Sequence, residues 1–486
     1  MVTRVGNILG YMLMVLGLSK FLPIIVAVVS GEENLILPFF LSGLFTFFVG
    51  GALYISFTSL QDRASRHEMI LLMIVIWFGL PFFAAMPFMI TGFMTKLTDA
   101  YFEASSALTT TGSSLVINLD LVPNTILFWR ALLQWLGGIL VFVLAVAILP
   151  LSSIGGLDLF RSVLPHGEGD DLLARIRYAF TPLFKIYAAL TFVCAMLLFT
   201  FDMTAFEALL LSMATLSSGG FTSQGVQGVN SMTGLTELIL IPFMIIAATN
   251  MTFHWAFLTR GRVNIYRQDP EILSFLYMLL GASILIFLTV LFSSDMQNIG
   301  LLKKAEIAVF TTVSSMTTTG FVPDHAESMP LAAIVICLIL LFIGGTTGST
   351  AGGFKILRIN LMKKNADKEV NRLTYPNGIT PISYGGQVVS QATLVSIWTL
   401  LFVFISALAI ITILFGAMGY DLQTSLGLSM TSIFSAGGLI PLLSSDFVGY
   451  HSLSYAGKWL ASFAMILGRI EIIALFVLLM PSFWKN

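Results

Sequence analysis

The chain has 486 residues, of which 57% are hydrophobic and only 10% are charged, and its formal net charge is −1. A soluble globular protein carries roughly 25% charged residues, so this chain has too few charges to cover a water-facing surface. We therefore expect a protein embedded in a lipid bilayer. The near-zero net charge provides no field that would attract nucleic acid.

Apolar segments long enough to cross a bilayer, which takes about 20 residues, recur along the whole chain. Ten of them are predicted transmembrane helices: 7–29, 38–59, 69–92, 125–150, 183–202, 235–259, 272–293, 330–358, 390–416 and 455–480. The first follows Arg4, is long and lacks a convincing cleavage site, so we interpret it as a retained span rather than a signal peptide. The predicted fold class is an all-α membrane protein.

Four shorter apolar segments lie between some of these spans. They cover residues 99–110, 205–217, 302–317 and 421–435. A helix of about 11 residues reaches only ~16 Å, which is half of the ~30 Å hydrocarbon thickness. Each segment is therefore predicted to enter the membrane and return on the same side. Its non-helical return strand is tolerated only beside protein or water, so four such segments predict one shared polar axis.

Lys and Arg residues indicate which side of the membrane each loop faces. The basic loops are 61–68, 160–185, 260–267 and 355–372, with Lys96 and Lys303–Lys304 as exceptions elsewhere. By the positive-inside rule the basic loops are cytoplasmic, so both termini are predicted inside and the four short segments enter from outside. We interpret the run 355–376 as a basic loop that touches anionic lipid or docks a regulatory protein.

Each short segment ends in a strand of small hydroxyl residues and glycine. The four strands are Thr109–Gly112, Ser217–Gly220, Thr317–Gly320 and Ser435–Gly438, and their last glycines recur at intervals of 100 to 118 residues. One such run alone would be a helix-packing site or a turn, but four copies indicate an internal repeat. The predicted units are two extra spans in 1–60, followed by pore repeats at 61–155, 156–260, 261–375 and 376–486.

These strands have the composition expected of a cation filter. Rings of backbone carbonyls can replace the hydration shell of an ion, and glycine permits the positive φ angles that aim carbonyls at an axis. The C-terminal ends of the half-helices add partial negative charge, and the strands contain no carboxylate. The predicted K⁺-binding filter residues are Thr110, Thr111, Gly112, Ser218, Gly219, Gly220, Thr318, Thr319, Gly320, Ala436, Gly437 and Gly438.

A glycine-rich interruption in the eighth span predicts a gate below the filter. It consists of Gly344, Gly345, Thr346, Thr347, Gly348, Ser349, Thr350, Ala351, Gly352 and Gly353. A helix broken at mid-depth must form its free backbone hydrogen bonds with protein or water. The alternative is a site of close helix packing, but five glycines in ten residues are not typical of a helix.

Counting residues from the filter glycines places other polar residues at the same depth. Arg469 lies 31 residues beyond Gly438, and an arginine inside a span is a functional candidate. We expect it to face the pore as part of the gate, or to pair with Glu471 or with a carbonyl of the loop. Asn250 is a candidate for the pore lining. Arg130 lies nearer the outside and is expected to hold a pore-helix terminus.

The sequence resembles the TrkH/KtrB/HKT superfamily of K⁺ and Na⁺ transporters over essentially its whole length. The resemblance rests on the four strands, on Trp129–Arg130 with Gln134–Gly138, on Gly344–Gly353 and on Gly468–Glu471. It implies that the filter glycines line a K⁺ site, and that glycine rather than serine at Gly112 favours K⁺. It also implies that the broken helix and the arginine form an intramembrane barrier. The implied assembly is a homodimer on a cytosolic, TrkA-like nucleotide-binding ring, in the bacterial inner membrane.

Two other function classes fit the sequence less well than a gated channel for potassium uptake. An H⁺- or Na⁺-coupled symporter with alternating access would typically show inverted repeats, whereas these repeats run parallel about one axis. An enzyme is not expected, because the five His residues show no metal-binding spacing and no nucleophile–base set is visible. The chain also lacks a nucleotide-binding signature. We therefore expect no organic cofactor in this chain, and control by a ligand would require another subunit.

Overall fold

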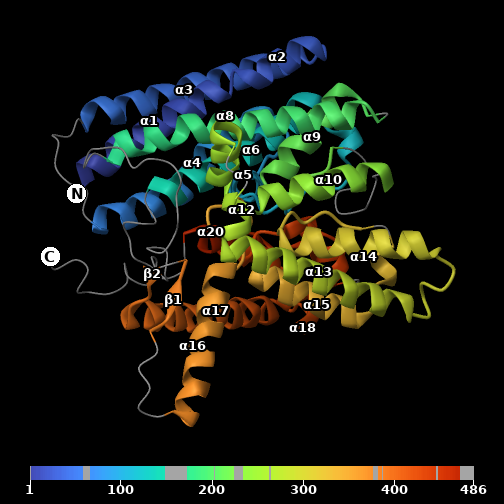
Figure 1. Ribbon diagram of the computed structural model, residues 1–486. Coiled ribbons are helices and arrows are strands. Elements are labelled where there is room, and N and C mark those ends of the chain that lie inside the picture. The colour runs from blue at the N-terminus through green and yellow to red at the C-terminus, as the bar shows by residue number, and fades with distance from the viewer. Residues whose placement is uncertain are drawn as a thin grey trace.

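The structure is a computed structural model that describes residues 2–57, 66–147, 172–201, 203–223, 234–261, 264–323, 325–375, 381–385, 387–444 and 447–470. The described chain is mostly α-helical, as the sequence predicts (Figure 1). Strands among these residues are confined to β1 (Ser383–Tyr384) and β2 (Gln387–Val388), which pair antiparallel with Ser383 opposite Val388. The tail of the tenth span, with Glu471, lies outside the described residues, as do Arg63 and residues 160–171 of the predicted loop 160–185.

The N-terminal helices form a hairpin along one edge of the molecule (Figure 1). They are α1 (Val2–Ser19), α2 (Leu22–Val29), the 3₁₀ turn η1 (Glu33–Leu35) and α3 (Ile36–Ser56). Glycines bring α1 and α3 close together, since a methyl group on Gly17 would lie 2.7 Å from the backbone nitrogen of Phe47. This is the small-residue packing common between membrane helices.

Four groups of helices follow, each with a long helix, a short helix and a second membrane helix. The first group is α4 (Arg66–Ile90), α5 (Leu97–Leu108) and α6 (Asn124–Ala147). The second is α8 (Leu172–Phe199), α9 (Ala205–Leu216), α10 (Gly234–Ala247) and α11 (Met251–Arg260). The third is α13 (Pro270–Leu291), α14 (Leu301–Met316), α15 (Leu331–Ile343) and α16 (Ile356–Thr374). The fourth is α17 (Gln391–Ala417), α18 (Leu422–Ile433) and α20 (Tyr455–Arg469).

Shorter elements connect these helices. They are η2 (Leu119–Leu121), α12 (Asn264–Gln268), η4 (Ala326–Ser328), η5 (Gly437–Leu439), α19 (Ile440–Leu443) and η6 (Tyr450–Ser452). Side-chain caps determine several helix starts. Thr204 and Glu207 form a capping box at α9, and Asp421 accepts a 3.1 Å hydrogen bond from the Thr424 amide at α18. Such caps satisfy first-turn N–H groups that have no partner within the helix.

The four groups pack as a closed ring. In each group the short helix contacts both membrane helices of its own group. The second membrane helix also contacts the short helix of the next group, through the pairs α6 with α9, α10 with α14, α15 with α18 and α20 with α5. The last pair joins the fourth group to the first, so the short helices surround a common centre.

The outside of the ring has the apolar surface expected in lipid. On α13 and α17, the side chains of Leu280, Phe402 and Ile413 are 62%, 72% and 68% exposed. The short helix α5, in contrast, is buried along almost its whole length. Most polar residues of the strands and short helices are therefore enclosed by protein, which is the arrangement that a bilayer requires.

The ten predicted spans match the structure with two corrections. Seven of them coincide with single stretches of helix that are long and apolar enough to cross a membrane. The predicted span 235–259 is instead bent by 95° between α10 and α11. The predicted span 330–358 ends early, because α15 stops at Ile343 and α16 leaves the bundle across α17 (Figure 1). The tenth span is described only as far as residue 470.

Candidate functional site

The four short helices end in the same backbone turn. The residue after each helix cap has positive φ: Thr110 (51°), Ser218 (53°), Thr318 (53°) and Ser435 (56°). The next amide bonds back into its helix, from Thr111 to Ser106 O (2.8 Å), Gly219 to Ala214 O (2.8 Å), Thr319 to Ser314 O (3.1 Å) and Ala436 to Thr431 O (2.9 Å). Positive φ is uncommon outside glycine, so its recurrence at one position indicates four equivalent strands.

This geometry corrects the register of the fourth strand by one residue. Ser435, not Ala436, is equivalent to Thr110, so Gly437 rather than Gly438 is equivalent to the last glycine of the other strands. The physical reason is that α18 ends one residue earlier than the sequence pattern indicates, with Phe434 as its cap. Gly437 also begins the 3₁₀ turn η5 instead of adopting positive φ, unlike Gly112 at 80°.

The strands touch one another through their glycines and leave no room for side chains. A Cβ atom on Gly112 would collide with the carbonyl oxygen of Gly219, and one on Gly220 with that of Thr319. A Cβ atom on Gly438 would collide with the Gly320 carbonyl oxygen and lie 3.6 Å from that of Gly220. Gly438 therefore approaches two other strands at once, which places it near the centre of the ring.

Hydrogen bonds close the ring between the fourth and first strands and support it from behind. The Gly437 amide donates to the carbonyl of Thr111 at 2.6 Å. The Gln134 side chain donates to the Gly219 carbonyl at 2.7 Å, and the Tyr450 hydroxyl donates to the Gly437 carbonyl at 2.9 Å. The Ala436 carbonyl also accepts from the Leu439 amide at 3.0 Å. Four carbonyls of the predicted filter thus already accept protein hydrogen bonds, so the carbonyls of the strands are not all equally available to an ion.

The two ends of the glycine-rich loop, residues 344–353, lie side by side. At its base the Phe354 amide donates to Phe342 O at 2.8 Å, and the Lys355 amide donates to Ile343 O at 2.9 Å. Inside the loop the Thr346 amide donates at 3.0 Å to Ala248 O, at the bend between α10 and α11. The two interrupted helices therefore satisfy each other's free backbone groups, as broken helices at membrane depth require.

The loop lies directly against the bases of the second and third strands. The hydroxyl of Thr350 is 2.7 Å from that of Ser218, and the Gly352 amide donates to the Thr318 hydroxyl at 2.6 Å. A Cβ atom on Gly352 would collide with the carbonyl oxygen of Phe434, at the end of α18. The loop therefore passes beneath three of the four strands.

Arg469 occupies the corresponding place beneath the first strand. Its Nε donates to Thr109 O at 2.7 Å, its Nη1 donates to Thr350 O at 2.9 Å, and its Nη2 donates to the Thr110 hydroxyl. The sequence left open whether Arg469 pairs with Glu471 or with a carbonyl of the loop, and the structure shows the hydrogen bond to the loop carbonyl of Thr350. The cation also lies at the C-terminal end of α5, where the helix dipole is negative.

Three of the four positive-φ hydroxyls are thus held by the loop or by Arg469. The fourth, on Ser435, is buried and has no hydrogen-bond partner among the residues that the structure describes. The sequence-predicted strands, loop and arginine are therefore brought together at one place. Asn250 is buried nearby, where its side chain caps α11 by accepting from the Thr252 amide at 3.1 Å.

Arg130 connects the middle of α5, rather than a pore-helix terminus, to the segment after the first strand, through a partner that the sequence analysis missed. It donates to the buried carboxylate of Glu103 at 2.7 Å and to the Ser114 hydroxyl at 2.8 Å. Its guanidinium lies 4.2 Å from the ring centroid of Phe221, beyond the second strand. A carboxylate in the middle of an apolar short helix was the signal that could have identified Glu103.

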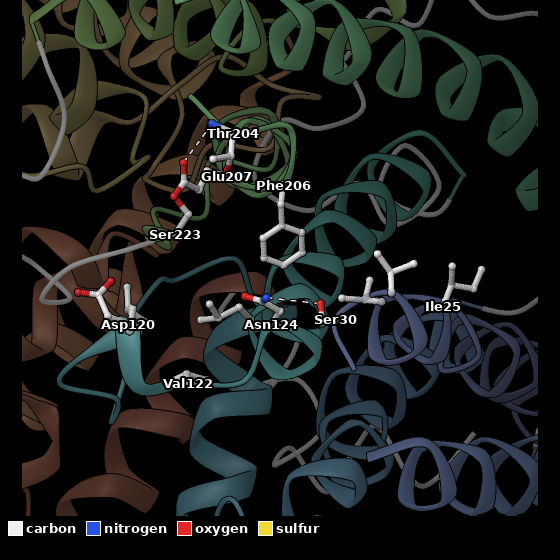
Figure 2. Close-up of a pocket in the computed structure, with 13 residues that line it drawn as sticks. Ile25, Ser30, Asp120, Val122, Asn124, Thr204, Phe206, Glu207 and Ser223 are labelled. Carbon is white, nitrogen blue, oxygen red and sulfur yellow. Dashed lines mark hydrogen bonds between the residues drawn. The ribbon is translucent and has the colours of Figure 1, made fainter. Parts of the chain in front are cut away.

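A cavity of about 510 Å³ lies apart from the ring, beside the segments that follow the first and second strands (Figure 2). It is lined by Ile25, Val26, Val29, Ser30, Leu119, Asp120, Val122, Asn124, Leu127, Thr204, Phe206, Glu207 and Ser223. None of the predicted filter or gate residues lines this cavity.

Comparisons with known proteins identify the family of this chain. Residues 36–485 match the family model TrkH, described as a cation transport protein. The chain is 32% identical to the Trk system potassium uptake protein TrkH of Vibrio parahaemolyticus, over 99% of each protein. It is 29% identical to the Trk system potassium uptake protein TrkG of Escherichia coli K12, over 99% of this chain and 98% of the relative. The crystal structure of the potassium transporter TrkH from Vibrio parahaemolyticus matches with a TM-score of 0.89 and 29% identity, covering 100% of both chains. This chain belongs to the TrkH family of cation transport proteins.

Proposed function

We propose that this protein is a potassium uptake protein of a bacterial membrane, in which K⁺ crosses through the centre of the four-strand ring. The observation that carries the proposal is the recurrence of one backbone turn in four strands that touch in a closed ring. Ion selectivity by rings of backbone oxygens needs such an arrangement. The Trk system potassium uptake relatives, which match along the whole chain, support K⁺ as the permeant ion.

The proposed filter consists of the residues predicted from the sequence, with Ser435 added at the base of the fourth strand. In this register each strand contributes a hydroxyl residue with positive φ and a glycine two positions later. Carbonyls that accept no protein hydrogen bond are the better ligands for a dehydrated cation. The Gly220 and Gly320 carbonyls, which lie near Gly438, are therefore proposed as the main K⁺ ligands.

The proposed gate is the loop 344–353 together with Arg469. Both lie against the bases of the strands, and the guanidinium places a fixed positive charge where a cation would leave the filter. Opening the path requires the hydroxyls of Thr110, Ser218 and Thr318 to exchange their present partners for the ion or for water. Asn250 acts indirectly in this scheme, because it caps the bent helix against which the loop lies.

We further propose that the chain works as a homodimer under control of a cytosolic, TrkA-like nucleotide-binding ring. The relatives are named as parts of a Trk system. The basic helix α16 extends from the bundle (Figure 1), and Val370 and Leu373 on it are 63% and 83% exposed. The proposed orientation has both termini in the cytoplasm, in the bacterial inner membrane, with pore repeats at 61–155, 156–260, 261–375 and 376–486.

Flux into reconstituted vesicles tests the proposal directly. The purified chain should carry ⁸⁶Rb⁺ into K⁺-loaded proteoliposomes, with K⁺ competing better than Na⁺, and should restore growth of K⁺-uptake-deficient cells at low K⁺. Absence of both activities in folded protein would refute it. Saturable uptake that requires an H⁺ or Na⁺ gradient would instead identify a coupled symporter. The same order of helix contacts recurs from each group to the next, as expected for parallel repeats, and this supports the channel over that alternative.

A further inference from the structure

Glu271 is a buried carboxylate that neither the filter nor the gate uses directly. It lies in the first turn of α13, which Asp269 caps by accepting from the amides of Glu271 at 2.9 Å and Ile272 at 3.0 Å. Its side chain points into the protein, and the residue is only 8% exposed. A buried carboxylate is costly unless hydrogen bonds compensate for the lost hydration, so its partners indicate what it does.

A single oxygen of Glu271 accepts three hydrogen bonds from two other segments. Oε1 receives the Thr347 amide at 2.6 Å and the Thr347 hydroxyl at 3.0 Å. It also receives the Leu357 amide at 3.2 Å. Thr347 belongs to the gate loop, whereas Leu357 is the second residue of α16. A net hydrogen bond contributes about 1 kcal/mol, so three of them on one oxygen connect the loop to the helix.

The start of α16 needs such a partner. Its first-turn N–H groups have no acceptor within the helix, and the cap residue Lys355 makes no side-chain capping hydrogen bond. Glu271 supplies the cap from another helix, because its Oε1 accepts from the Leu357 amide in the first turn of α16. One turn further along both helices, Asn360 donates to the Ser274 hydroxyl at 3.0 Å. Two successive turns of α16 are therefore attached to the first two turns of α13.

We propose that Glu271 is the positioning residue that couples α16 to the gate loop. When the exposed end of α16 moves, the helix pivots about its contact with the first turn of α13. The movement displaces Thr347, because Thr347 and α16 bond to the same carboxylate oxygen. Glu271 thereby holds the loop closed and transmits movement of α16 to it. This inference rests on the proposed role of the loop as a gate, and it assigns to that gate the residue through which regulation reaches it.

A cysteine in the loop provides a readout that does not depend on ion flux. Ser349 is 1% exposed and lies two residues from Thr347, so Ser349→Cys should react slowly with a water-soluble methanethiosulfonate reagent in the full-length protein. The native Cys194 and Cys337 are also buried, and the chain without the Ser349 substitution measures their background. The rate of modification then reports how often the loop opens.

Removing the carboxylate should free the loop. Loss of two to three hydrogen bonds of about 1 kcal/mol each corresponds to roughly 10- to 100-fold in an equilibrium, so Glu271→Ala should raise the modification rate of Ser349→Cys by that factor. Glu271→Gln keeps one acceptor oxygen and should give a smaller rise, and Thr347→Val, which removes one donor, should give a few-fold rise. Glu237→Gln, which alters another buried carboxylate at the start of α10, is the matched control and should leave the rate unchanged.

A double-variant cycle separates coupling from a merely structural role. Asn360→Ala loosens α16 from α13 and should raise the modification rate a few-fold when Glu271 is present. In the Glu271→Ala background the same substitution should add nothing, because the connection from α16 to the loop is already lost. Effects that simply multiply would overturn the proposal.

The outcomes distinguish this inference from the proposed function. Unchanged modification rates in Glu271→Gln and Thr347→Val would overturn the inference, and these mild variants serve if Glu271→Ala does not fold. If the wild-type chain carries ⁸⁶Rb⁺ and Arg469→Ala raises the flux while the Glu271 variants leave the loop unchanged, the gate stands and the inference falls. If no flux occurs, the proposed function falls, yet the cysteine readout still tests the coupling.

Discussion

Replacing Arg469 with alanine should raise cation flux more than any other single change near the filter. The substitution removes three hydrogen bonds that hold the loop and the end of α5 together. It also removes a positive charge from the place where the ion would pass. An ion bound by the Thr110 hydroxyl would lie about 5 Å from the guanidinium, since both groups would use the same oxygen, and at an effective dielectric constant near 20 the repulsion is about 3 kcal/mol.

A barrier lowered by about 3 kcal/mol corresponds to roughly a 100-fold increase in rate. We expect an increase of about 10- to 100-fold in ⁸⁶Rb⁺ uptake by proteoliposomes at a fixed protein-to-lipid ratio, because part of the barrier remains in the loop. Arg469→Lys keeps the charge but loses the planar donor arrangement, so its flux should rise less than that of the alanine variant.

Lys458→Ala is the matched control for Arg469→Ala. It removes one positive charge from the same helix, α20, at an ion pair with Asp99 near the helix start. Partly exposed pairs of this kind contribute little, so its flux should stay within about twofold of the wild-type value. Wild-type flux from Arg469→Ala in correctly folded protein would show that the arginine is no barrier, and the reasoning from its contacts would be refuted.

Three further predictions concern the strands and their supports. Gly112→Ser should lower the preference for K⁺ over Na⁺, because a side chain there would meet the Gly219 carbonyl at a φ of 80°; identical K⁺ and Na⁺ competition curves would contradict this. Thr350→Val removes the hydroxyl that lies 2.7 Å from that of Ser218, and a loss of about 1 kcal/mol should raise ⁸⁶Rb⁺ flux about fivefold, whereas unchanged flux would argue against this contact. Arg130→Ala leaves Glu103 buried without its partner and should cost about 3–5 kcal/mol of stability, seen as a lower Tm in detergent; Glu103→Gln combined with Arg130→Met should recover most of that loss.

Several features of the site were predictable because they depend on local sequence. The lengths of the apolar segments separate membrane helices from half-length helices, and the structure confirms the short helices α5, α9, α14 and α18. The placement of Arg469 at the depth of the loop followed from counting helical residues, and the hydrogen bond to Thr350 agrees with that placement. The roles of these residues in selectivity and gating remain predictions.

Other features depended on contacts that no local pattern encodes. The register of the fourth strand differs by one residue from the one that its glycine pair indicates in the sequence. The reason is that α18 ends at Ile433, and its cap residue Phe434 packs against other segments. The bend between α10 and α11 is stabilised by amides of the loop, about 100 residues away. A hydropathy pattern could not reveal it, because both halves of the bent helix are apolar enough to be taken for one span.

The membrane location, the four half-length helices and the strands of hydroxyl and glycine residues that follow them could all be inferred from the order of residues. Hydropathy, segment length and the conformational freedom of glycine are local properties, so they can be inferred from the order of residues. Which groups face one another depends instead on how the whole chain folds. Glu103 with Arg130 and Glu271 with Thr347 and Leu357 are joined across 27, 76 and 86 residues. Such pairs form because buried charges and backbone amides must find partners wherever the fold brings them together.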